Sequence, residues 1–239
     1  MSRLDVEMVS RGLAESRSRA RALITEGAVR VEGIVASKAS ASVATGAEIA
    51  VTCDGWVSRG TLKLMHGLDH FELSPEGAVA ADIGASTGGF TQVLLARGAA
   101  RVIALDVGHG QLHRSLAADP RVDSRQGINA RHLGPGDLPP LDWVVSDLSF
   151  ISLTKALGPA LAAVRAGGQL LCLVKPQFEL GPGAVGKGGI LRDDALRREA
   201  PERVAAWLEG LGWRVQGWTD SPIAGGDGNR EYLLAARAP

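Results

Sequence analysis

Short apolar segments alternate with helical segments through residues 56–239, and this alternation is the feature that most constrains the fold of the chain. Four apolar segments have the length of buried β-strands: they span Val79–Gly84, Val102–Asp106, Trp143–Asp147 and Gln169–Val174. Helical patterns cover Thr87–Arg97 and Leu191–Leu208. Strands that are apolar on both faces and are separated by helices form a parallel sheet with helices on its faces. The sequence therefore predicts an α/β fold for this part of the chain.

Residues 1–55 have a different character, because they lack such apolar strands. Apolar residues at helical spacing predict two short helices before residue 27. The segments Val29–Val31 and Ile34–Val35, joined by a Glu-Gly turn, predict a hairpin. We therefore expect a small α+β domain over residues 1–55 and a larger α/β domain over residues 56–239.

Arginines concentrate in the small domain, although the whole chain is neutral, with 26 Lys and Arg against 26 Asp and Glu. Several of them lie at the start of the second predicted helix, where the helix dipole is already positive and an external anion would be stabilising. The planar guanidinium group matches phosphate oxygens, so these arginines form either a solvated helix face or a surface that contacts phosphates. The candidates for phosphate contact are Arg3, Arg11, Arg17, Arg19, Arg21, Arg30 and Arg59.

A glycine-rich turn follows the first apolar strand of the large domain and opens a helix. Such a turn lets a ligand approach the backbone, and an acidic residue at the end of the next strand can bind a ribose diol. The spacing is G-x-x-x-G-G and differs from the G-x-G-x-x-G of nicotinamide-binding proteins. A tight turn without a ligand is the alternative. The candidate cofactor-binding residues are Asp82, Gly84, Ser86, Thr87, Gly88, Gly89, Phe90, Asp106, Val107, Asn129 and Asp147.

Titratable side chains stand at the ends of further strands. Asp147 ends one strand and Lys175 follows another, and ligands of open α/β sheets bind beyond the carboxyl ends of the strands. Partial burial would favour the neutral amine of Lys175, which can accept a proton. Lys63, at the beginning of the large domain, and Glu231, before a further predicted strand at Tyr232–Ala236, are additional candidates. Each of the four could instead be a surface charge.

Six ordered motifs make the chain resemble the TlyA family. They are WVSRG (56–60) followed by Lys63, DIGASTGGFT (82–91), DVGHGQL (106–112), DLSFISL (147–153), LVKPQFE (173–179) and GNREYLL (228–234). The resemblance covers nearly the whole chain. It departs from the family at His109, where an aromatic residue often occurs, which could alter the wall of the pocket.

The resemblance implies a Rossmann-like class I methyltransferase domain joined to an N-terminal RNA-binding domain like that of ribosomal protein S-four. It implies methyl transfer from S-adenosylmethionine to the ribose 2′-hydroxyl of a cytidine in ribosomal RNA, with ribosomal RNA or ribosomal subunits as partners. It also implies a Lys-Asp-Lys-Glu tetrad, which corresponds here to Lys63, Asp147, Lys175 and Glu231. Members of the family are also named haemolysins.

Other classes of protein are less consistent with the sequence. Two His pairs have i,i+4 spacing, His66/His70 and His109/His113, but no third ligand accompanies them, so we expect no metal. No apolar run approaches 18 residues, so we expect no membrane association, and the two cysteines indicate a reducing cytoplasm. A non-catalytic RNA-binding protein and a membrane-lytic haemolysin remain alternatives.

Overall fold

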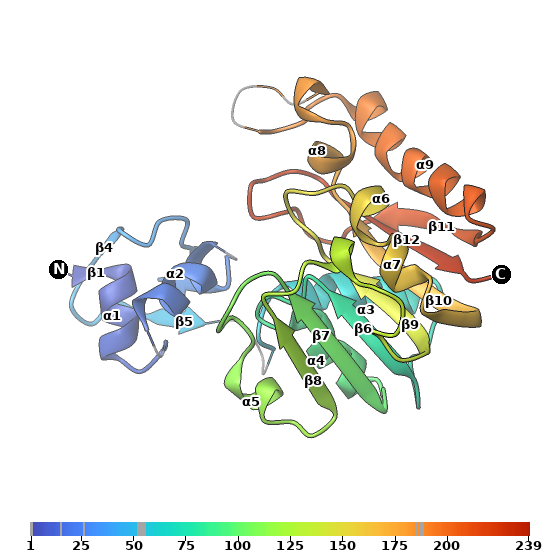
Figure 1. Cartoon of the computed structure of the whole chain (residues 1–239). Helices are drawn as coiled ribbons and strands as arrows, with labels where there is room; N and C mark the ends of the chain where they lie inside the picture. Colours follow the sequence, from blue (N-terminus) through green and yellow to red (C-terminus); the bar gives the residue numbers. More distant parts are fainter. Residues whose placement is uncertain (1, 15, 26, 52–55, 185, 187–188) are drawn as a thin grey trace. The chain divides into compact units, whose positions relative to one another are not determined.

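The computed structural model describes residues 2–14, 16–25, 27–51, 56–184, 186 and 189–239. These residues form two compact units, Met1–Arg59 and Gly60–Pro239 (Figure 1).

The N-terminal unit packs two helices against short antiparallel strands. Its elements are β1 (Ser2–Arg3), α1 (Leu4–Ser10), α2 (Arg17–Thr25), β2 (Val29–Val31), β3 (Ile34–Val35), β4 (Ser42–Val43) and β5 (Ile49–Val51). β1 pairs with β4, while β2 lies between β3 and β5 in a second sheet. Leu4 and Met8 of α1 pack with Leu23 and Ile24 of α2 in one apolar core. The two helices and the hairpin therefore form as the spacing of their apolar residues predicts.

The C-terminal unit is built on a seven-stranded sheet in the order β11-β12-β10-β9-β6-β7-β8. The strands are β6 (Val79–Ile83), β7 (Arg101–Asp106), β8 (Val122–Gln126), β9 (Leu141–Ser146), β10 (Val164–Val174), β11 (Arg214–Asp220) and β12 (Tyr232–Arg237). The pairings from β8 through β10 are parallel, whereas β12 is antiparallel to both of its neighbours. The chain leaves β6 toward β7 and later returns to the other side of β6 with β9. The order of the strands therefore reverses between β6 and β9.

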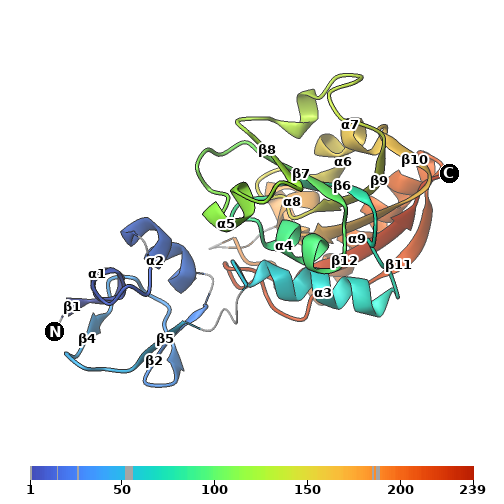
Figure 2. The same cartoon turned by 90° about the horizontal axis from the view of Figure 1, so that it is seen from below.

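Helices cover both faces of this sheet (Figure 2). They are α3 (Gly60–His70), α4 (Gly89–Ala96), α5 (Arg114–Ala117), α6 (Leu153–Ala156), α7 (Gly158–Leu161), α8 (Pro176–Glu179) and α9 (Asp194–Gly210), with short 3₁₀ turns at Ala130–His132 and Pro182–Ala184. α6, α7 and α9 pack on one face, where alternate strand residues such as Ile103, Leu105 and Cys172 form the main core. On the other face α3 lies so close to β10 that a Cβ on Gly67 would stand 3.0 Å from Leu171.

Candidate active site and RNA-binding surface

Strand register brings three of the predicted catalytic residues to one edge of the large sheet. β9 and β10 are parallel neighbours, and Asp147 and Lys175 are the residues that follow them. β12 runs antiparallel to β10 and pairs Tyr232 with Val174. Glu231 therefore precedes β12 next to the point where Lys175 follows β10.

Helix α3 supplies the fourth residue. Lys63 lies on the buried side of α3 with Leu64 and Leu68, and its Nζ donates a hydrogen bond of 2.6 Å to Oε2 of Glu231. The two side chains are 10% and 3% exposed, so they form a buried ion pair. Because such a pair is taken out of water, it stabilises the fold weakly at best and indicates another role.

Lys175 contacts two polar side chains on the loop after β9. Its Nζ lies 2.6 Å from Oδ1 of Asp147 and donates a 2.8 Å hydrogen bond to Oγ of Ser149. The side chain of Lys175 is 10% exposed. The ion pair with Asp147 and the hydrogen bond to Ser149 together hold this amine in position.

The electrostatics of Glu231 shows that the four charged groups share one environment. Burial raises the pKa of its carboxyl, and the nearby ammonium groups of Lys63 and Lys175 oppose this shift without overcoming it. The negative charge of Asp147 raises the pKa of Glu231 further. The charges of all four side chains therefore act on one another at this edge of the sheet.

A pocket of about 430 Å³ opens beside these residues, where the strand order reverses between β6 and β9. This is the place where open α/β sheets bind ligands. Among the predicted cofactor-binding residues, those that line it are Gly84, Ser86, Asp106, Val107, Asn129 and Asp147. Ser149 and Phe150 line it as well.

The carboxylate of Asp106 is oriented by the backbone. Its two oxygens accept hydrogen bonds from the N–H groups of Ser86 and Gly108, at 2.8 and 2.7 Å. A carboxylate oxygen has two acceptor sites, so each oxygen keeps one for a ligand such as a ribose diol. Asn129, which lines the same pocket, accepts a hydrogen bond from the N–H of Arg131 through its side-chain oxygen and keeps its amide N–H₂ as a donor. Together these groups fit the adenosyl portion of S-adenosylmethionine.

The remaining residues of the glycine-rich turn form its frame. Asp82 is fully buried, and its Oδ2 accepts hydrogen bonds from the N–H and Oγ1 of Thr91 at the start of α4. A Cβ on Gly84 would stand 2.9 Å from the carbonyl oxygen of Asp147, and one on Gly88 would overlap Leu116. Both glycines have positive φ, of 85° and 95°. They are required by close packing around the turn.

Three further residues of the turn lie outside the pocket lining. Gly89 and Phe90 are buried at the start of α4, and the carbonyl of Thr87 accepts a hydrogen bond from the N–H of His113. The backbone of Thr87 and the burial of Gly89 and Phe90 therefore help to hold the turn in place.

Three residues that shape the site were not among those predicted from the sequence. Ser149 contacts Lys175, and Phe150 is 91% exposed at the pocket with a strained positive φ of 67°. Glu179 accepts hydrogen bonds from Oγ of Ser152 and N–H of Leu153, which ties α8 to the loop after β9. All three belong to sequence motifs on which the family resemblance rests. Their closeness in sequence to Asp147 and Lys175 is the feature from which they could have been predicted.

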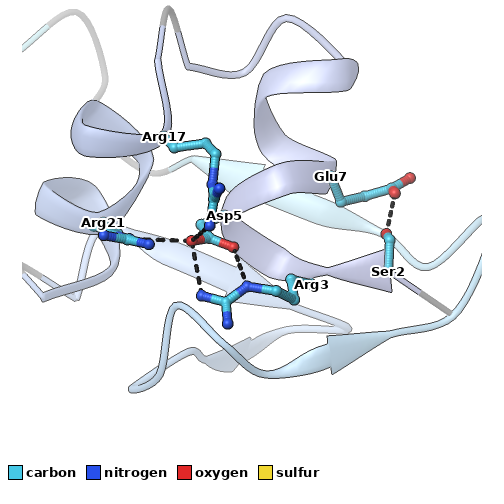
Figure 3. Close-up of polar contacts among 6 residues, drawn as sticks. All are labelled: Ser2, Arg3, Asp5, Glu7, Arg17 and Arg21. Atoms are coloured by element: carbon cyan, nitrogen blue, oxygen red, sulfur yellow. Dashed lines mark hydrogen bonds and ion pairs between the residues drawn. The ribbon is translucent and has the colours of Figure 1, made fainter.

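In the N-terminal unit, three of the predicted RNA-binding arginines converge on one acidic residue. Arg3, Arg17 and Arg21 all donate hydrogen bonds to the carboxylate of Asp5 (Figure 3). The arginine side chains are 47%, 53% and 54% exposed, and that of Asp5 is 0% exposed. They lie together on the surface formed by β1, α1 and α2.

The other predicted arginines of this unit bind elsewhere. Arg11 contacts Glu7 and the carbonyl of Ala47, and Arg30 donates to the carbonyl of Gly33. Arg19 donates to the carbonyl of Val57, and Arg59 is partly buried in the same unit. These four arginines are separate from the cluster around Asp5.

The described part of the chain contains neither a candidate membrane-spanning helix nor a candidate metal-binding cluster. Among those residues, no helix combines the length and the apolar character needed to cross a membrane. Over the same residues, His, Cys, Asp and Glu side chains do not gather in a group of three that could hold a metal ion.

Comparison with known proteins agrees with this geometry. Residues 56–238 match the model of FtsJ-like methyltransferases, and residues 2–49 match the S4 domain. A solved S-adenosylmethionine-dependent methyltransferase from Mesorhizobium loti superposes with a TM-score of 0.53 at 18% identity, covering 71% of this chain and 95% of that one. The mostly parallel seven-stranded sheet is that of a class I methyltransferase, as predicted, and a small S4 domain precedes it.

More similar proteins define the family. The 16S/23S rRNA (cytidine-2′-O)-methyltransferase TlyA of Mycobacterium tuberculosis is 45% identical over 240 residues, which cover 99% of this chain and 90% of that protein. A solved structure of a hemolysin-named protein from Streptococcus thermophilus is 38% identical, with a TM-score of 0.78 over 99% of this chain and 88% of that one. The chain belongs to the TlyA family of FtsJ-like methyltransferases with an N-terminal S4 domain.

Proposed function

We propose that this chain transfers a methyl group from S-adenosylmethionine to the ribose 2′-hydroxyl of a cytidine in ribosomal RNA, with Lys63, Asp147, Lys175 and Glu231 as the tetrad. The name of the relative from M. tuberculosis supports the substrate. The observation that carries the proposal is the position of Lys175, whose amine is held by Asp147 and Ser149, two residues that line the pocket.

The pocket residues have distinct roles toward the cofactor. Asp106 would bind the ribose diol through its remaining acceptor sites, and Asn129 would donate to a polar edge of the adenosyl group. Gly84 and Ser86 would border it along the backbone of the turn. When bound, S-adenosylmethionine supplies an electrophilic methyl group on a sulfonium.

Lys175 acts as the general base. A ribose hydroxyl is a poor nucleophile, so its proton must be accepted while its oxygen forms the new bond to carbon. The neutral amine of Lys175 takes this proton, and Asp147 stabilises the resulting ammonium. Glu231 keeps Lys63 in place through their 2.6 Å contact.

The N-terminal S4 domain binds the RNA. The arginines of this domain contact phosphates, which position the substrate without reading its sequence. The 2′-hydroxyl distinguishes RNA from DNA at the reacting atom. Because the substrate is ribosomal RNA, the reaction takes place in the cytoplasm.

Replacement of the proposed base tests the mechanism. Lys175→Ala should lower the single-turnover rate by about 10²–10⁴-fold, because general base catalysis contributes that much. Calorimetry should show that S-adenosylmethionine still binds, since Lys175 does not belong to the residues that line the pocket. Methylation at the rate of the unchanged protein would refute the role of Lys175.

The substrate needs a separate test. Ribosomal RNA from cells with and without the protein should differ by a ribose methyl group, which mass spectrometry of nuclease fragments locates. If the ribosomal RNA of the two kinds of cell carries the same ribose methyl groups, and the pure protein fails to methylate ribosomal subunits, the proposed substrate is refuted.

A further inference from the structure

The carboxylate of Asp5 is buried under the three arginines that it binds. Its Oδ1 accepts from Nε of Arg3 at 2.9 Å, and its Oδ2 accepts from Nη2 of Arg3, Nη2 of Arg17 and Nε of Arg21 at 3.0, 3.3 and 3.1 Å (Figure 3). Each guanidinium has five N–H donors, so Asp5 uses a minority of those that the three groups carry. The arginines are therefore anchored on one side and about half exposed.

The local sequence explains why the three arginines meet. Arg17 and Arg21 are four residues apart on α2 and hence share one face of this helix. Asp5 lies in the first turn of α1, and Arg3 lies just before it on β1. Because α1 and α2 share one apolar core, Asp5 is held against the arginine face of α2.

The charge of this cluster does not change with pH in the physiological range. The hydrogen bond from Arg3 holds the pKa of Asp5 well below its usual range, with further lowering by Arg21 and Arg17, and these effects exceed the opposing effect of burial. Three cations face one carboxylate, so the cluster keeps an excess of two positive charges. Without Asp5, the same three cations would repel one another and move apart.

We infer that Asp5 is a positioning residue for RNA binding: it holds Arg3, Arg17 and Arg21 as one preorganised unit that binds neighbouring phosphates of the RNA backbone. This inference rests on the proposed function, because it requires that the S4 domain bind RNA. Guanidinium groups that are already ordered lose little rotamer freedom when they bind phosphate, which improves affinity. Asp5 itself makes no contact with the RNA and acts through the arginines.

Asp5→Asn should weaken RNA binding, although simple electrostatics predicts that this substitution strengthens it. Asp5→Asn removes a negative charge from a surface that attracts an anion, so the count of charges predicts tighter binding. Preorganisation predicts weaker binding, because the amide nitrogen of Asn opposes guanidinium donors and the arginines lose their common anchor. Loss of one or two ordered phosphate contacts corresponds to about a 10- to 100-fold higher Kd.

The experiment compares two variants that change the net charge equally. Asp5→Asn is the test, and Glu48→Gln is the matched control, because Glu48 is exposed in the same unit and the ion pairs of the three arginines go to Asp5. Binding of each full-length protein to ribosomal subunits is measured at several salt concentrations. Single-turnover methylation at saturating protein is measured in parallel.

We expect Asp5→Asn to raise Kd by at least 10-fold and to lower the slope of log K against log salt by about 1, the contribution of one phosphate contact. The rate at saturating protein should stay unchanged, which separates binding from catalysis. Glu48→Gln should bind as tightly as the unchanged protein or slightly more tightly. Equal or tighter binding by a folded Asp5→Asn protein would overturn the inference.

If circular dichroism shows that Asp5→Asn does not fold, a second variant tests whether Asp5 preorganises the three arginines for RNA binding. Arg3→Lys keeps the charge and removes the two-pronged contact with Asp5. Preorganisation predicts weaker binding by Arg3→Lys, and unchanged binding would overturn it. The proposed RNA-binding function fails in a different way: the unchanged protein would then show no salt-dependent binding to ribosomal subunits at all.

Discussion

Replacement of Glu231 by Gln should destabilise the large unit, because Lys63 would keep a buried ammonium without its carboxylate. At the observed separation of 2.6 Å, two unit charges attract by about 6 kcal/mol at an effective dielectric constant of 20. Desolvation of both ions offsets much of this attraction, and loss of one partner of a buried pair generally costs about 3–5 kcal/mol. Burial already outweighs the attraction of Lys63 in the pKa of Glu231, so we expect about 3 kcal/mol, the lower end of that range.

A double variant separates stability from function. Lys63→Met with Glu231→Leu replaces the ion pair by apolar side chains of similar size, which is often neutral or stabilising. We therefore expect the double variant to unfold at a urea concentration close to that of the unchanged protein. Methyl transfer should nevertheless be lost in both variants, because Lys63 and Glu231 belong to the proposed tetrad.

Urea unfolding, followed by tryptophan fluorescence, measures the loss of unfolding free energy in Glu231→Gln and in the double variant. The large unit contains Trp143, Trp207, Trp213 and Trp218, so the signal is dominated by it. With a slope of about 3 kcal/mol per molar urea, the Glu231→Gln variant should unfold at about 1 M less urea. A change in unfolding free energy below about 0.5 kcal/mol, within the range of ordinary surface substitutions, would refute the buried ion pair. An active double variant would refute the catalytic role of the pair.

Three further predictions concern the site. Ser149→Ala should lower kcat about 10-fold or more with little change in KM, whereas Ser149→Thr should restore it, because the hydroxyl orients Lys175. Burial raises the pKa of Asp82 to about 7, so the contribution of this residue to the stability of the protein should fall as pH rises from about 4 to 7. Urea unfolding of Asp82→Asn at pH 5 and 7.5 should lack this loss of stability. Equal pH dependence of stability in the variant and the unchanged protein would contradict the pKa shift. Gly84→Ala should destabilise the large unit by about 2–4 kcal/mol, because the new Cβ would stand 2.9 Å from the carbonyl oxygen of Asp147 at a residue with positive φ. A urea midpoint equal to that of the unchanged protein would contradict this.

The central strands of the sheet could be predicted because they are buried on both faces and therefore read as continuous apolar runs. β8 (Val122–Gln126) and β11 (Arg214–Asp220) were not predicted, since both are edge strands with half-exposed, largely polar side chains. The pairing of β1 with β4 involves two residues on each side, too few to produce a pattern. An edge strand is stabilised by pairing with the adjacent strand, and the periodicity of its own sequence carries no information about that pairing.

The candidate site was predictable to the extent that it lies at strand ends. Asp147 and Lys175 follow apolar strands, and the general rule for open sheets then places them at the ligand-binding edge. Ser149 could not be found in this way, because its contact with Lys175 depends on the path of a loop. Asp5 was missed for another reason: a lone aspartate near a chain end is normally exposed, and only the packing of α1 against α2 buries it.

Asp5 and Glu231 are both buried carboxylates that face cations, yet their pKa values shift in opposite directions. Asp5 accepts four hydrogen bonds from three guanidinium groups, which together outweigh burial. Glu231 has one ammonium in contact and the negative charge of Asp147 nearby, so burial dominates. The first arrangement fixes a charge, as a phosphate-binding surface requires. The second pairs two lysines with two carboxylates at one edge of the sheet. Because the pKa of Asp5 lies well below its usual range, RNA affinity should be insensitive to pH near neutrality.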